Sequence, residues 1–283
     1  MGFALELKRY GKAIFLFLEE RLSRETFEAF YNFSFPKYKA IVRELYGAKR
    51  LLPVQGRPGM VERVYKAMPY TLVGVGGLEA SYELACELNE EKLPGAFIEL
   101  GVAQGGCAAL ISELAFESEA PEREVWLFDS FEGLPEPTED DYIYGKTGNH
   151  MRPLPKGSCL GTLEEVKRLL FREYSLPESR IHLVKGWFQD TLPKEKNNVG
   201  PIALLRIDGD WYESTKCCLE HLYEQVVDGG AIIIDDFDSC FGCKKAVQEF
   251  LESRSLNPEL HFDGRGGCFF RKTYETYRAQ ANI

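Results

Sequence analysis

Residues 202–210, Ile-Ala-Leu-Leu-Arg-Ile-Asp-Gly-Asp, and residues 231–236, Ala-Ile-Ile-Ile-Asp-Asp, are the stretches that decide the fold. Each is a short apolar run that stops at acidic residues, which is typical of a buried strand ending at the edge of a sheet. Further apolar runs lie at residues 96–100, 125–128, 181–184, 260–262 and 268–271. Helix-length segments separate most of these runs, and this alternation predicts a parallel sheet covered by helices on both faces.

The last two apolar runs are connected differently from the others. Only residues 263–267, Asp-Gly-Arg-Gly-Gly, lie between them, so we expect an antiparallel hairpin rather than a helical crossover. The sequence therefore predicts an α/β fold with a mostly parallel seven-stranded sheet whose final strand is antiparallel.

The first 69 residues predict a separate helical extension. Apolar residues recur at three- and four-residue spacing over residues 5–45, where Pro36 is expected to divide two helices. Prolines and glycines over residues 52–69 indicate a linker. The extension is net basic whereas the remainder is acidic, and we expect this layer to mediate homo-oligomer contacts. Residues 70–283 form the main domain.

The composition is that of a soluble globular protein. Of 283 residues, 45% are hydrophobic and 28% are charged, which is sufficient for a packed core. The net charge of −10 disfavours binding to nucleic acids. The apolar run at residues 14–18 is too short to span a membrane or to direct export. We therefore expect a cytoplasmic protein whose eight cysteines are reduced.

A glycine-rich turn follows the strand predicted at residues 96–100. The strand contains Glu99 and leads into Gly101 and Gly105, and these three residues are candidates for cofactor binding. Glycines allow the backbone to approach a ligand closely, and an acid suits an ammonium or a hydroxyl better than a pyrophosphate. The spacing differs from the G-x-G-x-x-G of dinucleotide-binding turns. A purely structural turn remains the alternative.

Asp129 and Ser130 follow the next predicted strand and are also candidates for cofactor binding. An acid at this position can accept hydrogen bonds from both ribose hydroxyls of a nucleoside. The alternative is a helix N-cap, since Asp and Ser both favour that position.

Four aspartates end the two strands that decide the fold. Asp208, Asp235 and Asp236 are the candidate metal ligands, because carboxylates at neighbouring strand ends repel one another unless a cation binds, and oxygen ligands favour Mg²⁺ or another hard divalent ion. Asp210 is then the candidate general base. Asp208 is also a candidate catalytic and cofactor-binding residue. Solvated surface acids are the alternative.

Several runs together resemble those of the macrocin O-methyltransferase family, which methylates sugars in natural-product pathways with the help of a metal. The resemblance covers about residues 70–272. Its marks are Asp129-Ser-Phe-Glu-Gly-Leu-Pro135, Gly186-Trp-Phe-Gln-Asp-Thr-Leu-Pro193, Asp208-Gly-Asp210 and Asp235-Asp236. The predicted strand content is likewise similar to that of the Rossmann-like S-adenosylmethionine methyltransferase fold.

The resemblance implies methyl transfer from S-adenosylmethionine to a sugar hydroxyl of a small, glycosylated natural product, with Mg²⁺ at the three aspartates and Asp210 as base. It also implies that the cofactor lies near the Glu99 and Gly101 turn, with Asp129 on the ribose and Gly186 and Trp187 beside the adenine. Similar proteins form homo-oligomers.

Two alternatives stay open, one for the acceptor and one for the class of function. A phenol or catechol acceptor would use the same cofactor and metal, and a non-catalytic nucleoside- or sugar-binding module is the alternative of another class. The loop at residues 136–158, which contains His150, suits a lid, with an ordinary surface loop as the alternative. Cys240 and Cys243 form a C-x-x-C, but no second pair accompanies them, and we assign no zinc or redox site.

Overall fold

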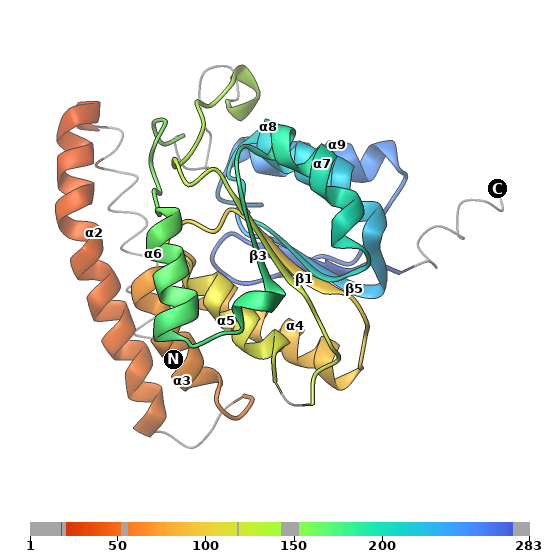
Figure 1. Cartoon of the computed structure of the whole chain (residues 1–283). Helices are drawn as coiled ribbons and strands as arrows, with labels where there is room; N and C mark the ends of the chain where they lie inside the picture. Colours follow the sequence, from red (N-terminus) through yellow and green to blue (C-terminus); the bar gives the residue numbers. More distant parts are fainter. Residues whose placement is uncertain (1–17, 19–20, 52–55, 118, 143–152, 274–283) are drawn as a thin grey trace. The chain divides into compact units, whose positions relative to one another are not determined.

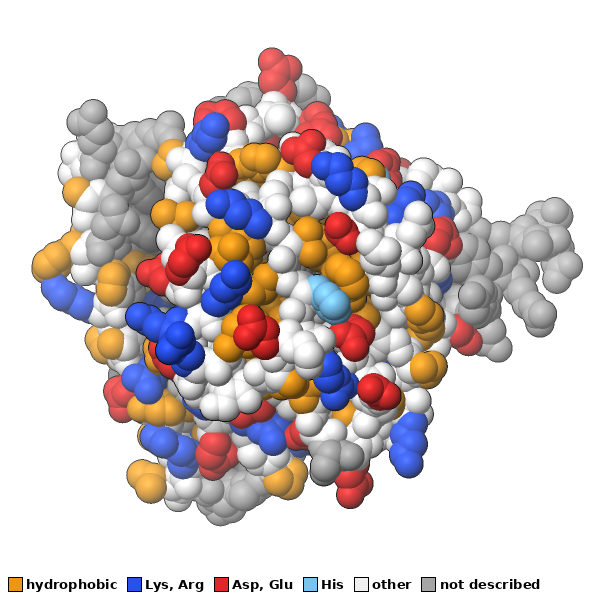
Figure 2. Space-filling view, in the orientation of Figure 1, with side chains coloured by type: hydrophobic (Ala, Val, Ile, Leu, Met, Phe, Trp, Pro, Cys, Tyr) orange, Lys and Arg blue, Asp and Glu red, His pale blue; other side chains and the backbone are white. Residues whose placement is uncertain are grey.

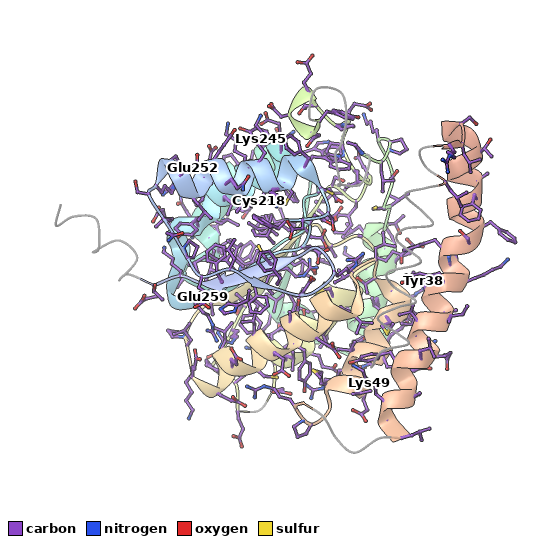
Figure 3. All side chains as sticks on the ribbon, turned by 180° about the vertical axis from the view of Figure 1, so that it is seen from behind. Tyr38, Lys49, Cys218, Lys245, Glu252 and Glu259 are labelled. Atoms are coloured by element: carbon purple, nitrogen blue, oxygen red, sulfur yellow. The ribbon has the colours of Figure 1, made fainter. Side chains whose placement is uncertain are left out.

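The computed structural model describes residues 18, 21–51, 56–117, 119–142 and 153–273. The chain divides into two compact units, Met1–Pro69 and Tyr70–Ile283. In the first unit, α2 (Arg24–Gly47), η1 (Ala48–Leu51) and α3 (Met60–Ala67) are followed by η2 (Met68–Tyr70) at the boundary. Tyr38 and Lys49 are labelled in this unit in Figure 3.

Two predictions for the first unit were wrong. Helix α2 continues through Pro36. A proline inside a helix removes one backbone hydrogen bond, but the helical turns on either side of Pro36 keep the path of the helix. The proposed linker contains α3, in which Met60, Val64 and Ala67 are buried. This spacing of four and three residues is a helical period, which the preceding prolines and glycines obscured.

The second unit is built on a seven-stranded sheet of order β3-β2-β1-β4-β5-β7-β6. Its strands are β1 (Ala96–Leu100), β2 (Val125–Asp129), β3 (Ile181–Lys185), β4 (Ile202–Ile207), β5 (Val226–Ile234), β6 (His261–Phe262) and β7 (Cys268–Arg271). The first five pair in parallel, whereas β7 is antiparallel to both of its neighbours. The predicted fold class is confirmed.

Helices cover both faces of this sheet (Figure 1), with α4 and α5 on one face and α7, α8 and α9 on the other. The long helices are α4 (Val75–Glu90), α5 (Gly106–Ala115), α7 (Phe188–Val199), α8 (Tyr212–Leu222) and α9 (Phe241–Ser253). Shorter elements are η3 (Glu139–Asp141), α6 (Leu163–Arg168), η4 (Leu169–Glu173), η5 (Glu178–Arg180) and η6 (Tyr223–Gln225). The cover on two faces explains why the central strands β1 and β4 are buried along their whole length.

The centre of the sheet defines where a ligand would bind. Every residue of β1 and β4 is buried, and the strand order reverses between these two strands. In open α/β sheets, ligands bind at the carboxyl ends of the strands that flank such a reversal. Asp208 and Asp210 follow β4, and Asp235 and Asp236 follow its other neighbour, β5.

Acidic and basic side chains are mixed on the face of the molecule shown in Figure 2. Within the described part of the chain, no helix is both long and apolar enough to cross a membrane.

Candidate active site

Backbone hydrogen bonds bring the ends of β1, β4 and β5 together. The N–H of Asp208 donates to Leu100 O at 2.8 Å, and the N–H of Asp235 donates to Ile207 O at 3.0 Å. Each aspartate therefore sits one step beyond a strand end and beside the end of the neighbouring strand. The predicted clustering of strand-end acids follows directly from this pairing.

In the glycine turn after β1, the first position, Gly101, accepts only glycine. Gly101 has φ +91°, and a Cβ there would lie 1.8 Å from Asp208 O. Gly105, with φ +89°, immediately precedes α5. The close approach of Gly101 to the Asp208 backbone shows that this glycine serves the packing of β1 against β4, in addition to any contact with a ligand.

Asp129 holds the same turn from the end of β2. Its Oδ2 accepts the N–H of Val102 at 2.7 Å and of Ala103 at 2.9 Å, and its Oδ1 accepts the N–H of Phe131 at 2.6 Å. Burial raises the pKa of Asp129, and the three N–H donors oppose that rise. Asp129 thus shapes the glycine turn rather than capping a helix, and its Oδ1, which accepts one N–H whereas Oδ2 accepts two, keeps a lone pair for a ribose hydroxyl.

Ser130 is engaged within its own turn. Its hydroxyl donates to Gly133 O at 3.0 Å and accepts the N–H of Glu132 at 3.1 Å. Gly186 lies close by, because its N–H donates to Asp129 O at 2.9 Å. The half-buried Trp187 comes next, immediately before α7. The structure thus brings Gly186 beside the predicted ribose site.

The four aspartates form two overlapping groups. Ligand atoms of Asp208, Asp235 and Asp236 all lie within 4.8 Å of one another, and so do those of Asp210, Asp236 and Cys240. Asp236 belongs to both groups. Asp210 has φ +55°, in the left-handed region that non-glycine residues rarely adopt.

Arg206 is a central residue that the sequence analysis missed. It is completely buried on β4, and its Nη1 lies 2.9 Å from Asp208 Oδ2 and 3.2 Å from Glu99 Oε1. Its Nη2 lies 2.5 Å from Asp235 Oδ1. The expectation that only a bound cation relieves the repulsion among the aspartates was therefore incomplete. The signal was present, since an arginine inside a buried strand requires charged partners.

Glu99 faces Arg206 in this arrangement. It is buried, its Oε1 makes the ion pair described above, and its Oε2 has no hydrogen-bond partner among the described residues. Burial raises the pKa of Glu99 to about 8, although the nearby Arg206 acts in the opposite direction. A contact between Glu99 and a cofactor stays a prediction.

Asp236 is a buried carboxylate of the cluster that has no hydrogen-bond or ion-pair partner among the described residues. It is 7% exposed. Burial and the nearby Asp210 raise the pKa of Asp236 well above its usual range. A buried carboxylate in this state suits a site for a cation.

The loop predicted as a lid is anchored to α8 and α9. Asp141 is buried, and its Oδ1 accepts the N–H of Tyr212 at the start of α8 at 2.8 Å. Asp140 makes an ion pair of 2.5 Å with Lys245, which is labelled on α9 in Figure 3. Residues 143–152, including His150, lie outside the described residues, so closure of the loop stays a prediction.

A mostly parallel seven-stranded sheet with an antiparallel β7 and acids at its central strand ends defines the class of S-adenosylmethionine methyltransferases. The sequence model described as Macrocin-O-methyltransferase (TylF) matches residues 53–272. The chain belongs to this family and is an O-methyltransferase.

Relatives and a solved structure agree with this assignment. The chain is 35% identical over 212 residues to demethyldecarbamoylnovobiocin O-methyltransferase of Streptomyces niveus, covering 75% of this chain and 79% of the relative. It is 31% identical over 223 residues to 8-demethyl-8-(2,3-dimethoxy-alpha-L-rhamnosyl)-tetracenomycin-C 4'-O-methyltransferase of Streptomyces olivaceus, covering 78% and 83%. The solved O-methyltransferase NovP superimposes with a TM-score of 0.64 at 28% identity, covering 83% of this chain and 99% of that one.

Proposed function

We propose that the chain transfers the methyl group of S-adenosylmethionine to a sugar hydroxyl of a small glycosylated natural product, in a Mg²⁺-dependent reaction. The observation that carries the proposal is the buried, uncompensated carboxylate of Asp236 among strand-end aspartates. The acceptor class is supported by the relatives, since one of them is named for a rhamnosyl-bearing substrate.

The residues present fit a hard divalent cation. Asp208, Asp235 and Asp236 would hold it through carboxylate oxygens, the donors that Mg²⁺ prefers. Asp235 is the least available of the three, because its Oδ1 bonds to Arg206 and its Oδ2 lies 3.5 Å from Arg265. When bound, the ion lowers the pKa of a hydroxyl that it coordinates.

The cofactor would lie along the ends of β1 and β2. Asp129 holds the Gly101 turn, and its Oδ1 keeps a lone pair for a ribose hydroxyl. Gly186 and Trp187 would flank the adenine. The sulfonium methyl is already electrophilic, so the protein has to align donor and acceptor and exclude water.

Asp210 would accept the proton of the acceptor hydroxyl. Burial, Asp208 and Asp235 raise the pKa of Asp210 well above its usual range, which is the direction that a general base requires. Its placement in the left-handed region is fixed by the turn between β4 and α8.

The first test is calorimetric titration of the intact chain with S-adenosylhomocysteine and with Mg²⁺. We expect Asp208→Asn to abolish the heat of Mg²⁺ binding and to keep S-adenosylhomocysteine binding. We expect Asp129→Ala to abolish S-adenosylhomocysteine binding and to keep the heat of Mg²⁺ binding. Asp238→Asn is the control, since Asp238 is partly exposed and pairs with Lys244. If the intact chain binds neither ligand, the proposal fails.

The second test separates the acceptor classes. Methyl transfer is measured with a glycosylated natural product, with its aglycone and with a simple catechol. Transfer to the glycosylated compound alone supports the proposal, whereas transfer to the catechol alone establishes the phenolic alternative. The non-catalytic alternative has lost its support, because the chain belongs to a family of O-methyltransferases.

A further inference from the structure

We propose that Cys240, Asp210 and Asp236 form a site for a thiophilic divalent cation such as Co²⁺, Zn²⁺ or Cd²⁺, adjoining the proposed Mg²⁺ site. Binding of such an ion is independent of the proposed function. Only its consequence for activity depends on the proposed role of Asp210.

Two segments, the turn after β4 and the turn between β5 and α9, bring these ligands together. Asp210 follows β4, Asp236 follows β5, and Cys240 immediately precedes α9. The N–H of Cys240 donates to Asp236 O at 2.9 Å, which turns the chain back toward the strand end. As a result, Cys240 Sγ and a carboxylate oxygen of each aspartate lie within 4.8 Å of one another. Ligand atoms around one metal ion have separations in this range.

The balance of charge supports a cation at this position. Arg206 pairs with both Asp208 and Asp235. By contrast, neither Asp210 nor Asp236 has a hydrogen bond or an ion pair to its side chain within residues 56–117, 119–142 and 153–273. The Cys240 side chain is 2% exposed and also has no hydrogen bond among these residues. Asp236 and Cys240 are therefore buried polar groups directed at one point without a partner.

The sulfur ligand sets the class of ion. Thiolates select softer metals, whereas Mg²⁺ and Ca²⁺ prefer oxygen. Cys240 immediately precedes the 13-residue helix α9, and burial together with the nearby Asp236 and Asp210 raises the pKa of its thiol, so a bound cation has to supply the stabilisation of the thiolate. On binding, the thiol releases its proton to solvent as the sulfur–metal bond forms.

Competition follows from the shared ligand. Because Asp236 belongs to both groups, a thiophilic ion at Cys240 would compete with Mg²⁺ for it. Such an ion would also occupy Asp210, the proposed base. We therefore expect thiophilic ions to inhibit methyl transfer in the wild type and to inhibit it at least about tenfold less effectively in Cys240→Ser.

The test is a Co²⁺ titration of the full chain without cofactor or acceptor, followed by the near-ultraviolet thiolate-to-cobalt charge-transfer band. We expect the band in the wild type and its loss in Cys240→Ser, with Co²⁺ affinity lowered at least about tenfold, the smaller end of what loss of a supporting contact costs a metal site. The matched control is Cys243→Ser, which changes a buried cysteine of the same helix outside the group and should keep the band.

Absence of the band in the wild type would overturn the proposal, and so would its persistence in Cys240→Ser. Cys159 provides the sharpest alternative, because burial and then the nearby Asp210 and Asp208 raise the pKa of its thiol. A band that disappears in Cys159→Ser but not in Cys240→Ser assigns the sulfur to Cys159 and refutes the site. Cys240→Ala serves if the serine variant does not fold. Methyl transfer does not enter this readout, so a missing cobalt band leaves the proposed function unaffected.

Discussion

Arg206 is a buried cation shared by three carboxylates. Glu99, Asp208 and Asp235 approach it from three strand ends within 3.2 Å. Burying so many charges is costly unless each finds a partner, and removal of one partner leaves the others uncompensated. The arginine therefore links the stability of the sheet to the geometry of the candidate active site.

Replacing Arg206 by methionine should lower the free energy of unfolding by about 3–5 kcal/mol. Urea unfolding followed by tryptophan fluorescence measures this loss, since all three tryptophans lie in the second unit. Arg168→Met is the control, because Arg168 is 64% exposed in its pair with Glu173 and should contribute less than about 1 kcal/mol. Equal effects of the two changes would contradict the role assigned to Arg206.

Glu99 should make stability depend on pH. Its pKa in the folded chain is about 8, above the ordinary value of 4.5, so the folded state holds a proton that the unfolded state has lost between these values. The stabilisation from protonated Glu99 is complete below pH 4.5 and is lost as the pH rises through about 8. Glu99→Gln removes this titration while keeping a hydrogen-bonding oxygen.

Relative to wild type, Glu99→Gln should therefore gain stability with rising pH, by at most about 1.4 kcal/mol per pH unit. Urea unfolding of both proteins at a series of pH values from about 5 to about 8 gives the difference. A difference that stays constant with pH would show that Glu99 is ionised in the folded chain.

At the scale of elements, the loop after β2 and the two helices α8 and α9 are joined through Asp141. Helix α8 has no side-chain cap of its own at Trp211, and Asp141 supplies one from the loop. A Cβ at Gly242 would lie 1.9 Å from Asp141 Oδ1, so the approach of α9 depends on glycine there. Asp141 is a positioning residue for the segment that carries Asp210.

Asp141→Ala should lower the free energy of unfolding by about 1–2 kcal/mol, as loss of a helix cap does. It should also lower kcat by a larger factor than it changes the KM for S-adenosylmethionine. The reason is that Asp210 loses its support, whereas the Gly101 turn does not. Asp141→Asn keeps an acceptor oxygen and should restore most of both properties. Asp140→Ala is the control, since its ion pair with Lys245 is partly exposed; an equally large loss in that variant would refute the capping role.

The strand ends were predictable because buried strands in a parallel sheet finish at one edge, so the acids after residues 207 and 234 had to meet. The hairpin of β6 and β7 was predictable from its short turn. The local pattern failed in the first unit, where helix α2 continues through Pro36 and α3 follows closely on a stretch rich in proline and glycine.

The sequence predicted which residues form the candidate site, but it did not predict which side chains pair with one another. Asp208, Asp210, Asp235 and Asp236 come together as the sequence indicated. The engagement of Arg206 depends on which face of β4 its side chain takes, and the approach of Cys240 depends on how the chain turns after Asp236. Neither follows from spacing along the chain.

At the scale of the whole molecule, the two compact units differ in surface character. Most of the large apolar side chains that are exposed among the described residues belong to the first unit, namely Phe33, Ile41, Leu45 and Leu51. Ile41 and Leu45 are one helical turn apart on α2 and share a face. An apolar face in a net basic unit, in a chain whose remainder is acidic, suits contact with a second copy of this chain.

We therefore expect the intact chain to be a homo-oligomer that the double change Ile41→Glu and Leu45→Glu converts to monomer. Two carboxylates forced into an apolar contact should weaken association about a hundredfold or more, since each 1.4 kcal/mol is a factor of ten. Light scattering coupled to size-exclusion chromatography measures the mass of each species. Leu160→Glu is the control, because Leu160 is an exposed leucine of the second unit and its change should leave the oligomer intact. A monomeric intact chain, or an oligomer that the double change does not disturb, would show that α2 does not form the contact.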